Sequence, residues 1–340
     1  IENYVSLRRE LESEGNDFLS ETDSEVVAHL LGQAYEKCGG DLAEAMRQTC
    51  KRLDGAFSLV AVHAKSPDQI VGARRNSPLV VGVGDSERFL ASDVAAFIEY
   101  TSAAIELGQD QVVLITPDTV SITDFSGNKV KGKEFKVTWD AAAAQKDGYP
   151  HFMAKEIMEQ PKAVADTLLG RLDEKGKLIL NEIRIAEEDL RDVEKIIIIG
   201  CGSAFHAGMI AKYAIEHWTR IPVEVELASE FRYRDPIIDR GTLVIAISQS
   251  GETMDTLMAL RHAKDQRAKV LSICNTNGST IPRESDGVLY THAGPEVAVA
   301  STKAFLTQIV ASYLVGLYIA QVRGLKFSDE IRKILAELQE

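Results

Sequence analysis

Apolar residues recur with two different periods in the first 137 residues of the chain. From residue 1 to about 53 the period is helical, and the clearest helix carries one apolar face made of Val26, Val27, Leu30, Leu31, Ala34 and Tyr35. Thr22 and Glu25 have the spacing of a capping box, which predicts that this helix begins there. Between about residues 56 and 137 short β-rich runs replace the helices, at 57–63, 79–83, 89–91 and 111–116. This pattern predicts an α+β domain with antiparallel strands.

After residue 194, strand-like and helical runs alternate. They lie at 195–199, 204–218, 242–247, 253–266, 269–274, 287–290 and 302–322. Such alternation predicts an α/β fold, a doubly wound parallel sheet with helices on both faces. An Ala-rich stretch that ends in Gly and Pro, at 140–150, precedes two helical segments at 152–159 and 161–172. We therefore expect domains at 1–139 and 195–325, a linker with helices at 140–194, and the start of a further segment at 326–340.

Composition narrows the classes of function. The 340 residues carry a formal net charge of -13, which argues against broad contact with nucleic acid or with an anionic membrane surface. The apolar stretch 305–322 is interrupted by polar residues, so it predicts a buried helix rather than a membrane span. The four cysteines, Cys38, Cys50, Cys201 and Cys274, have neither metal-ligand nor disulfide-framework spacing. We expect a cytoplasmic protein with no metal site and no cofactor.

Three loops that follow predicted strands carry the candidate chemistry. The first, Gly200-Cys201-Gly202-Ser203, joins an apolar strand to a helix, but position 205 is Phe205 instead of the third glycine of a dinucleotide fingerprint. The second is Ser248-Gln249-Ser250-Gly251-Glu252-Thr253, and the third is Glu296-Val297-Ala298-Val299-Ala300-Ser301-Thr302-Lys303. Hydroxyl groups and free N–H groups at a helix start can hold a phosphate without Lys or Arg. Because all three loops follow strands of one sheet, we expect them to converge on a sugar-phosphate pocket.

Simpler interpretations exist for each loop. The glycines of the first loop fit an unliganded tight turn, and Cys201 is either an activated thiolate or a small buried residue. Ser250 could cap the following helix by itself, and Ser301 or Thr302 could be a plain N-cap. Lys303 is either a structural or solvated lysine, which we favour, or a contact to the ligand.

Several segments together resemble the glutamine:fructose-6-phosphate amidotransferase family. In the second half these are the 248–253 loop, Ala228-Ser229-Glu230-Phe231-Arg232-Tyr233-Arg234 and Val299-Ala300-Ser301-Thr302-Lys303, which resemble the first sugar-isomerase (SIS) domain of that family. In the first half, Glu2-Asn3-Tyr4, 20–25, Asp54-Gly55-Ala56-Phe57, 76–79 and 91–93 look like the later part of its N-terminal-nucleophile (Ntn) glutaminase domain. Tyr149-Pro150-His151-Phe152-Met153 to Glu159-Gln160-Pro161 resembles its linker. The resemblance covers nearly the whole chain.

The resemblance implies a set of ligands and site residues. The implied sugar-phosphate contacts are Cys201, Gly202, Ser203, Ser248, Gln249, Ser250, Thr253, Val299, Ala300 and Ser301. Asp23 matches the family's carboxylate for the α-ammonium of glutamine, although an Asp in the first turn of a helix is also stabilised by the helix dipole. At 203–204 the chain has Ser-Ala where the family usually has Thr-Ser, which puts one contact in doubt. The implied ligand is fructose 6-phosphate or glucosamine 6-phosphate, and the implied assembly is a homodimer.

The resemblance also implies the overall reaction, which is amino-sugar synthesis: ammonia from glutamine is delivered to fructose 6-phosphate, which becomes glucosamine 6-phosphate. The family's nucleophilic Cys and oxyanion residues would lie upstream of Ile1, and its ring-opening His, isomerising Glu and Lys beyond Glu340. We therefore expect no catalytic residue in these 340 residues, and no activity from them alone. Two alternative functions each require a further feature. A glutamine phosphoribosyl-pyrophosphate amidotransferase would need an acidic-pair loop, which is not seen, and a regulatory SIS module without catalysis would need a DNA-reading helix-turn-helix.

Overall fold

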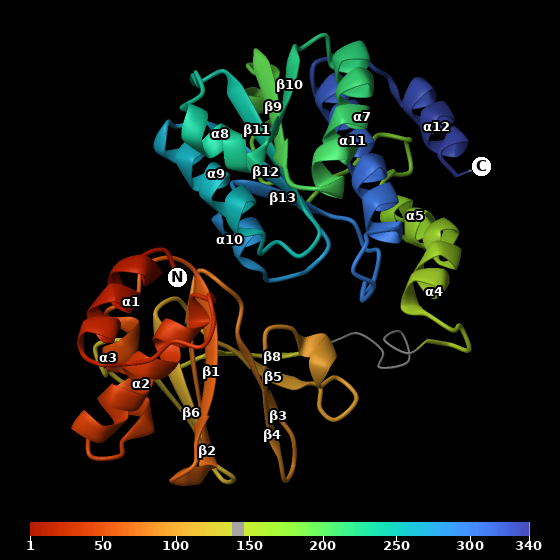
Figure 1. Ribbon diagram of the computed structural model, residues 1–340. Helices are drawn as coiled ribbons and strands as arrows, with labels where there is room; N and C mark the ends of the chain where they lie inside the picture. The colour runs from red at the N-terminus through yellow and green to blue at the C-terminus, as the bar shows by residue number, and fades with distance from the viewer. Residues whose placement is uncertain (138–145, 340) are drawn as a thin grey trace. The chain divides into compact units, whose positions relative to one another are not determined.

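The computed structural model describes residues 1–137 and 146–339, and the chain divides into two compact units, Ile1–Ala141 and Ala142–Glu340 (Figure 1). The expected boundary between residues 139 and 140, and the first part of the expected linker, lie outside the described residues. Each unit has its own apolar core.

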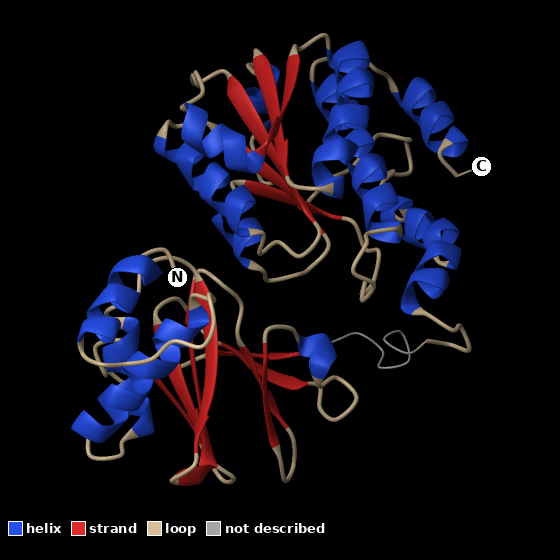
Figure 2. Cartoon of the chain, viewed as in Figure 1, coloured by secondary structure: helices blue, strands red, loops and turns tan. Residues whose placement is uncertain are grey.

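The first unit combines helices with antiparallel sheets, as the pattern predicted (Figure 2). Its helices are α1 (Tyr4–Ser13), α2 (Ser24–Lys37), α3 (Leu42–Cys50) and the short 3₁₀ helix η1 (Val94–Ala96). One sheet has the order β1 (Phe57–His63), β2 (Ser66–Arg75), β6 (Gln111–Ile115) and β7 (Val120–Asp124). The other has the order β4 (Arg88–Ala91), β3 (Val80–Val83), β5 (Ala103–Glu106) and β8 (Lys133–Lys136). Leu30 of α2 and Met46 of α3 share one core with Val71 and Val112 of the first sheet.

The predicted capping box at the start of α2 does not form. The helix begins at Ser24, and its N-cap residue, Asp23, makes no side-chain capping bond. The Glu25 carboxylate instead accepts the backbone N–H groups of Leu19 at 2.7 Å and Ser20 at 2.8 Å. The Glu25 carboxylate therefore bonds to the backbone of the preceding turn at 19–20, and it does not bond back to residue 22 as a capping box requires.

The second unit contains a parallel sheet with helices on both faces. The strand order is β10 (Val223–Leu227), β9 (Lys195–Gly200), β11 (Thr242–Ser248), β12 (Lys269–Cys274) and β13 (Gly287–Tyr290). Successive residues of a strand point to opposite faces. Accordingly Ile196 and Ile198 belong to one apolar cluster, and Ile197 and Ile199 belong to another.

Different helices cover the two faces of this sheet, as Figure 1 shows. The first cluster is completed by α7 (Ser203–Thr219) and α11 (Lys303–Val322), and the second by α8 (Ala228–Arg234), α9 (Met254–Asp265) and α10 (Thr280–Glu284). The remaining helices are α4 (Phe152–Met158), α5 (Gln160–Leu168), α6 (Glu187–Arg191) and α12 (Ser328–Glu337). The predicted helix 161–172 ends earlier, because Leu169 is extended and Gly170 has φ +72°. The doubly wound fold is confirmed.

Helix α11 is long and apolar enough to cross a membrane by length and composition. In this fold, 72% of its apolar window is buried, and the helix packs against α7 and α5. Thr307 and Ser312, which interrupt the apolar run, donate their hydroxyls to backbone carbonyls of the same helix. It is the buried helix that the sequence predicted.

A half-buried carboxylate outside the sheet, Glu182, gives a pH prediction. Burial alone would raise the pKa of Glu182, but His292 and Arg171 beside it lower that pKa from 4.5 to about 2. A carboxylate whose pKa is lower in the folded state than in the unfolded state stabilises the fold at a pH above its unfolded-state pKa. That stabilisation is lost as the pH falls through the folded-state pKa. Glu182→Gln is therefore expected to cost about 1 to 2 kcal/mol at pH 6, after allowance for solvent screening. In urea unfolding the gap from the parent should shrink from pH 4.5 downward; a gap that widens in acid would contradict this.

Candidate functional site

The three loops predicted to converge do so at the carboxyl ends of the parallel strands. Strand β11 lies between β9 and β12, and β12 pairs with β13, so the loops that follow these strands leave from one edge. The structure adds a fourth loop, 275–279 after β12, which sequence reasoning missed. The Asn275 N–H donates to the Gln249 carbonyl, and its side-chain oxygen accepts from the Thr291 hydroxyl and the Ala293 N–H. Asn275 thus ties the second loop to the segment that follows β13 and leads into the third loop.

Hydroxyl groups organise the 248–253 loop from within. Ser248 Oγ accepts the Gly251 N–H at 3.0 Å and lies 2.9 Å from Thr253 Oγ1, and Ser250 Oγ accepts the Glu252 N–H at 3.2 Å. Thr253 is the N-cap of α9 and makes no side-chain capping bond. The simple cap by Ser250 is therefore wrong. Among the described residues, no side chain caps the first turn of α9, so its N–H groups remain available to an anion.

Gly251 fits its position because the loop needs a left-handed residue there. Its φ is +67°, and a Cβ at this position would overlap Ser279 Oγ of the fourth loop. Glu252, next to it, accepts the Thr280 N–H at 2.7 Å and the Thr280 hydroxyl at 3.0 Å. Glu252 therefore binds the start of α10 and serves the loop as a structural anchor.

The first loop lies beside the second. Gly202 has φ +54°, and α7 begins at Ser203. Cys201 is partly buried, and its Sγ lies 3.8 Å from Thr256 Oγ1 of α9. Ala204, where the family usually has Ser, is buried in the apolar cluster beneath α7.

The third loop is held by a carboxylate and not by its own hydroxyls. Glu296 accepts the N–H groups of Thr302 at 2.9 Å and Ala304 at 3.0 Å, and also the Ser301 hydroxyl at 2.9 Å. The plain N-cap by Ser301 or Thr302 is therefore wrong, because Glu296 caps α11. Val299 and Ala300 lie exposed within this loop.

Lys303, the last residue of the third loop, is a structural residue. It is only 3% exposed, and its Nζ lies 2.6 Å from Glu159 Oε2. Its charge is neutralised inside the unit, in keeping with the interpretation that we favoured.

The glutamine-contact candidate lies in the first unit. The Asp23 carboxylate accepts from the Ser24 hydroxyl. Cys50 lies in α3, where burial raises the pKa of its thiol to about 12, and Cys38 lies at the end of α2 with its pKa also raised by burial. A fully buried thiol with a raised pKa is a poor nucleophile, so Cys50 has a packing role in α3.

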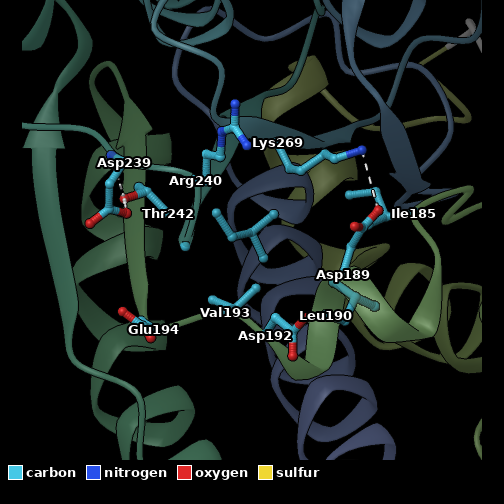
Figure 3. A pocket seen from close by; sticks show the side chains of 12 residues that line it. Ile185, Asp189, Leu190, Asp192, Val193, Glu194, Asp239, Arg240, Thr242 and Lys269 are labelled. Carbon is cyan, nitrogen blue, oxygen red and sulfur yellow. Dashed lines mark hydrogen bonds and ion pairs between the residues drawn. The ribbon is translucent and has the colours of Figure 1, made fainter.

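The second unit also has a hollow at the opposite edge of its sheet, with a volume of about 470 Å³ (Figure 3). It lies where β9, β11 and β12 begin, and Lys269 and Asp189 form an ion pair of 3.2 Å on its wall. Its lining contains none of the predicted site residues. Ligands of open α/β sheets bind at the other, carboxyl edge, so we keep the four loops as the candidate site.

Comparison with known proteins agrees with both halves of this description. The family model for the SIS domain matches residues 189–317, and the model for a glutamine amidotransferase domain matches residues 1–99. The chain is 68% identical over 338 residues to the glutamine–fructose-6-phosphate aminotransferase [isomerizing] of Streptomyces coelicolor, covering 99% of this chain and 55% of that protein. It is 63% identical over 340 residues to the protein of the same name from Corynebacterium diphtheriae, with 54% of that protein covered.

A solved structure supports the fold of the second unit. The C-terminal domain of glucosamine-fructose-6-phosphate aminotransferase from Francisella tularensis superposes with a TM-score of 0.55 at 45% identity, covering 57% of this chain and 55% of that chain. The chain spans about half the length of the curated relatives that it matches. The chain thus carries a SIS domain and a glutamine amidotransferase domain, and along 99% of its length it is similar to a glutamine–fructose-6-phosphate aminotransferase [isomerizing].

Proposed function

We propose that the second unit binds a sugar phosphate, either fructose 6-phosphate or glucosamine 6-phosphate, with the phosphate at the 248–253 loop. The observation that carries this proposal is the uncapped first turn of α9, with the hydroxyls of Ser248, Ser250 and Thr253 beside it. No Lys or Arg occurs between residues 248 and 258, so a phosphate there is held by hydrogen bonds and the helix dipole.

The other predicted residues have natural roles around that anion. Gln249, Ser203 and Ser301 flank the phosphate, and the sugar carbons and hydroxyls face the backbone at 201–202 and 299–300. Such a site fixes the phosphorylated end and leaves the carbonyl end of an open-chain sugar free to react. The names of the relatives agree with this assignment of ligand class.

At the level of the whole protein we propose the relatives' reaction, in which the ammonia of glutamine is transferred to fructose 6-phosphate to give glucosamine 6-phosphate. The first unit would supply part of an Ntn-type glutaminase fold. Asp23 is our candidate for the α-ammonium of glutamine, because its partly exposed carboxylate lies at the start of α2. The free cysteines of the described residues fit a reducing compartment, and we propose the cytoplasm.

We also propose a homodimer, through α7 rather than α11. The apolar helix α11 needs no cover from a partner, because α5 and α7 of its own unit pack against it. Helix α7 instead exposes Met209, Ile210 and Tyr213, at the three- and four-residue spacing of one helix face.

Calorimetry on the purified chain tests the sugar-phosphate site. We expect fructose 6-phosphate to bind and fructose to bind at least tenfold more weakly, because without an anion the loop donors stay unpaired. Raising the salt concentration from about 50 to about 500 mM should change the affinity for fructose 6-phosphate only severalfold, because no Lys or Arg side chain of the loop contacts the phosphate. Equal binding of fructose, or a steep salt dependence, would overturn the proposed site.

A further inference from the structure

Helix α4 of the second unit carries two buried charged side chains. Lys155 is 3% exposed and Glu156 is 2% exposed. Charged side chains are almost never buried to this extent unless they are paired. Their partners therefore show what the helix is built to hold.

Glu156 holds the backbone of the third loop. Its Oε1 accepts the N–H groups of Val297 at 2.6 Å and Ala298 at 3.1 Å, across more than 140 residues of sequence. These two amides directly precede Val299–Ser301, the segment that we expect to face the sugar. The other carboxylate oxygen, Oε2, is buried and has no hydrogen-bond partner among the described residues. One oxygen thus serves both amides.

Glu159, which follows α4, holds the other end of the third loop. Glu159 lies 2.6 Å from Lys303, the first residue of α11, and 3.5 Å from Lys155. Asp147 adds a second carboxylate at 2.9 Å from Lys155. Burial alone would lower the pKa of Lys155, but these two carboxylates raise it above its usual value. The third loop is therefore held before its sugar-facing segment by Glu156 and after it by Glu159.

We infer that Glu156 is a positioning residue for the sugar-facing segment at 299–301. This inference rests on the proposed sugar-phosphate site. Without the carboxylate, the N–H groups of Val297 and Ala298 lose their acceptor, and the peptide units there turn to find water. The 248–253 loop keeps its own internal hydrogen bonds, so the phosphate end of the site should be unaffected.

Two ligands separate a positioning role from a general loss of structure. Fructose 6-phosphate probes both ends of the site, and inorganic phosphate probes the phosphate end, where the 248–253 loop supplies most of the donors. The variants are Glu156→Ala, which removes the acceptor, and Glu156→Gln, whose amide oxygen can still accept both N–H groups. Met158→Ala changes an exposed side chain of the same helix and is the matched control.

Calorimetric titration should give a selective loss. In Glu156→Ala we expect affinity for fructose 6-phosphate to fall about tenfold while affinity for phosphate changes less than twofold. Glu156→Gln and Met158→Ala should bind both ligands within about twofold of the parent. An unchanged affinity for fructose 6-phosphate in Glu156→Ala, or an equal fall for both ligands, would overturn the inference.

The remaining outcomes are also decisive. If Glu156→Ala does not fold, Glu156→Gln still tests the inference. A tenfold loss of affinity for fructose 6-phosphate in Glu156→Gln would show that the negative charge matters and the acceptor oxygen does not. The inference would then fail. If the parent chain itself binds no fructose 6-phosphate, the proposed function fails instead, and the two failures are thereby distinguished.

Discussion

Replacing Ser250 and Thr253 together by alanine is expected to weaken the binding of fructose 6-phosphate about a hundredfold. Each hydroxyl can donate to a charged phosphate oxygen, and a hydrogen bond to a charged group contributes roughly 1.5 to 3 kcal/mol. The Thr253 change also removes the partner of Ser248 Oγ, which loosens the loop that presents the N–H groups. Isothermal calorimetry on the parent and the double variant measures the effect.

The control for this variant is a serine of the same unit outside the loop. Ser285 donates its hydroxyl to the Ile281 carbonyl at the end of α10, and Ser285→Ala should bind as the parent does. A double variant that binds fructose 6-phosphate within threefold of the parent would show that the phosphate is not held at this loop.

Glu159→Gln is expected to destabilise the second unit by about 3 kcal/mol. The substitution keeps the shape of the side chain but removes the carboxylate that neutralises Lys303, whose ammonium is almost fully buried. Breaking a buried pair from one side costs about 3 to 5 kcal/mol, and the lower end applies because Glu159 itself is 29% exposed. Urea unfolding followed by circular dichroism measures the loss.

Two further variants make this result specific. Asp166→Asn breaks the exposed pair with Lys162 on α5 and should cost less than about 1 kcal/mol. Adding Lys303→Met to Glu159→Gln removes the unpaired charge and should restore most of the lost stability. If Glu159→Gln costs no more than Asp166→Asn, the pair with Lys303 does not hold the loop.

The sheet of the second unit could be predicted from sequence because its central strands are buried on both faces. Residues 196–199 are a continuous apolar run between turn signals, and β9 lies there with neighbours on both sides. The edge strand β10 was missed. Glu224 and Glu226 alternate with its apolar residues, so the short run does not stand out as a strand. Charged residues on an edge strand are a common feature, but they weaken the signal.

The convergence of the loops was also predictable, whereas the contacts that hold them were not. Parallel strands place their carboxyl ends together whatever follows them, so the position of the loops follows from topology. The side chains that organise the third loop are Glu296 and Glu156, whereas local sequence patterns left Ser301 or Thr302 open as a cap. No local pattern shows that a carboxylate more than 140 residues away accepts the N–H groups of Val297 and Ala298.

The position of α4 also determines how the second unit can be separated from the rest of the chain. The match to the SIS family model begins at residue 189, well after Glu156 and Glu159. A polypeptide cut at that residue would leave the Lys303 ammonium without its carboxylate and two loop amides without their acceptor. We therefore expect that the shortest polypeptide that folds as the second unit begins before Asp147, because residues 147–159 carry the carboxylates that pair with Lys155 and Lys303.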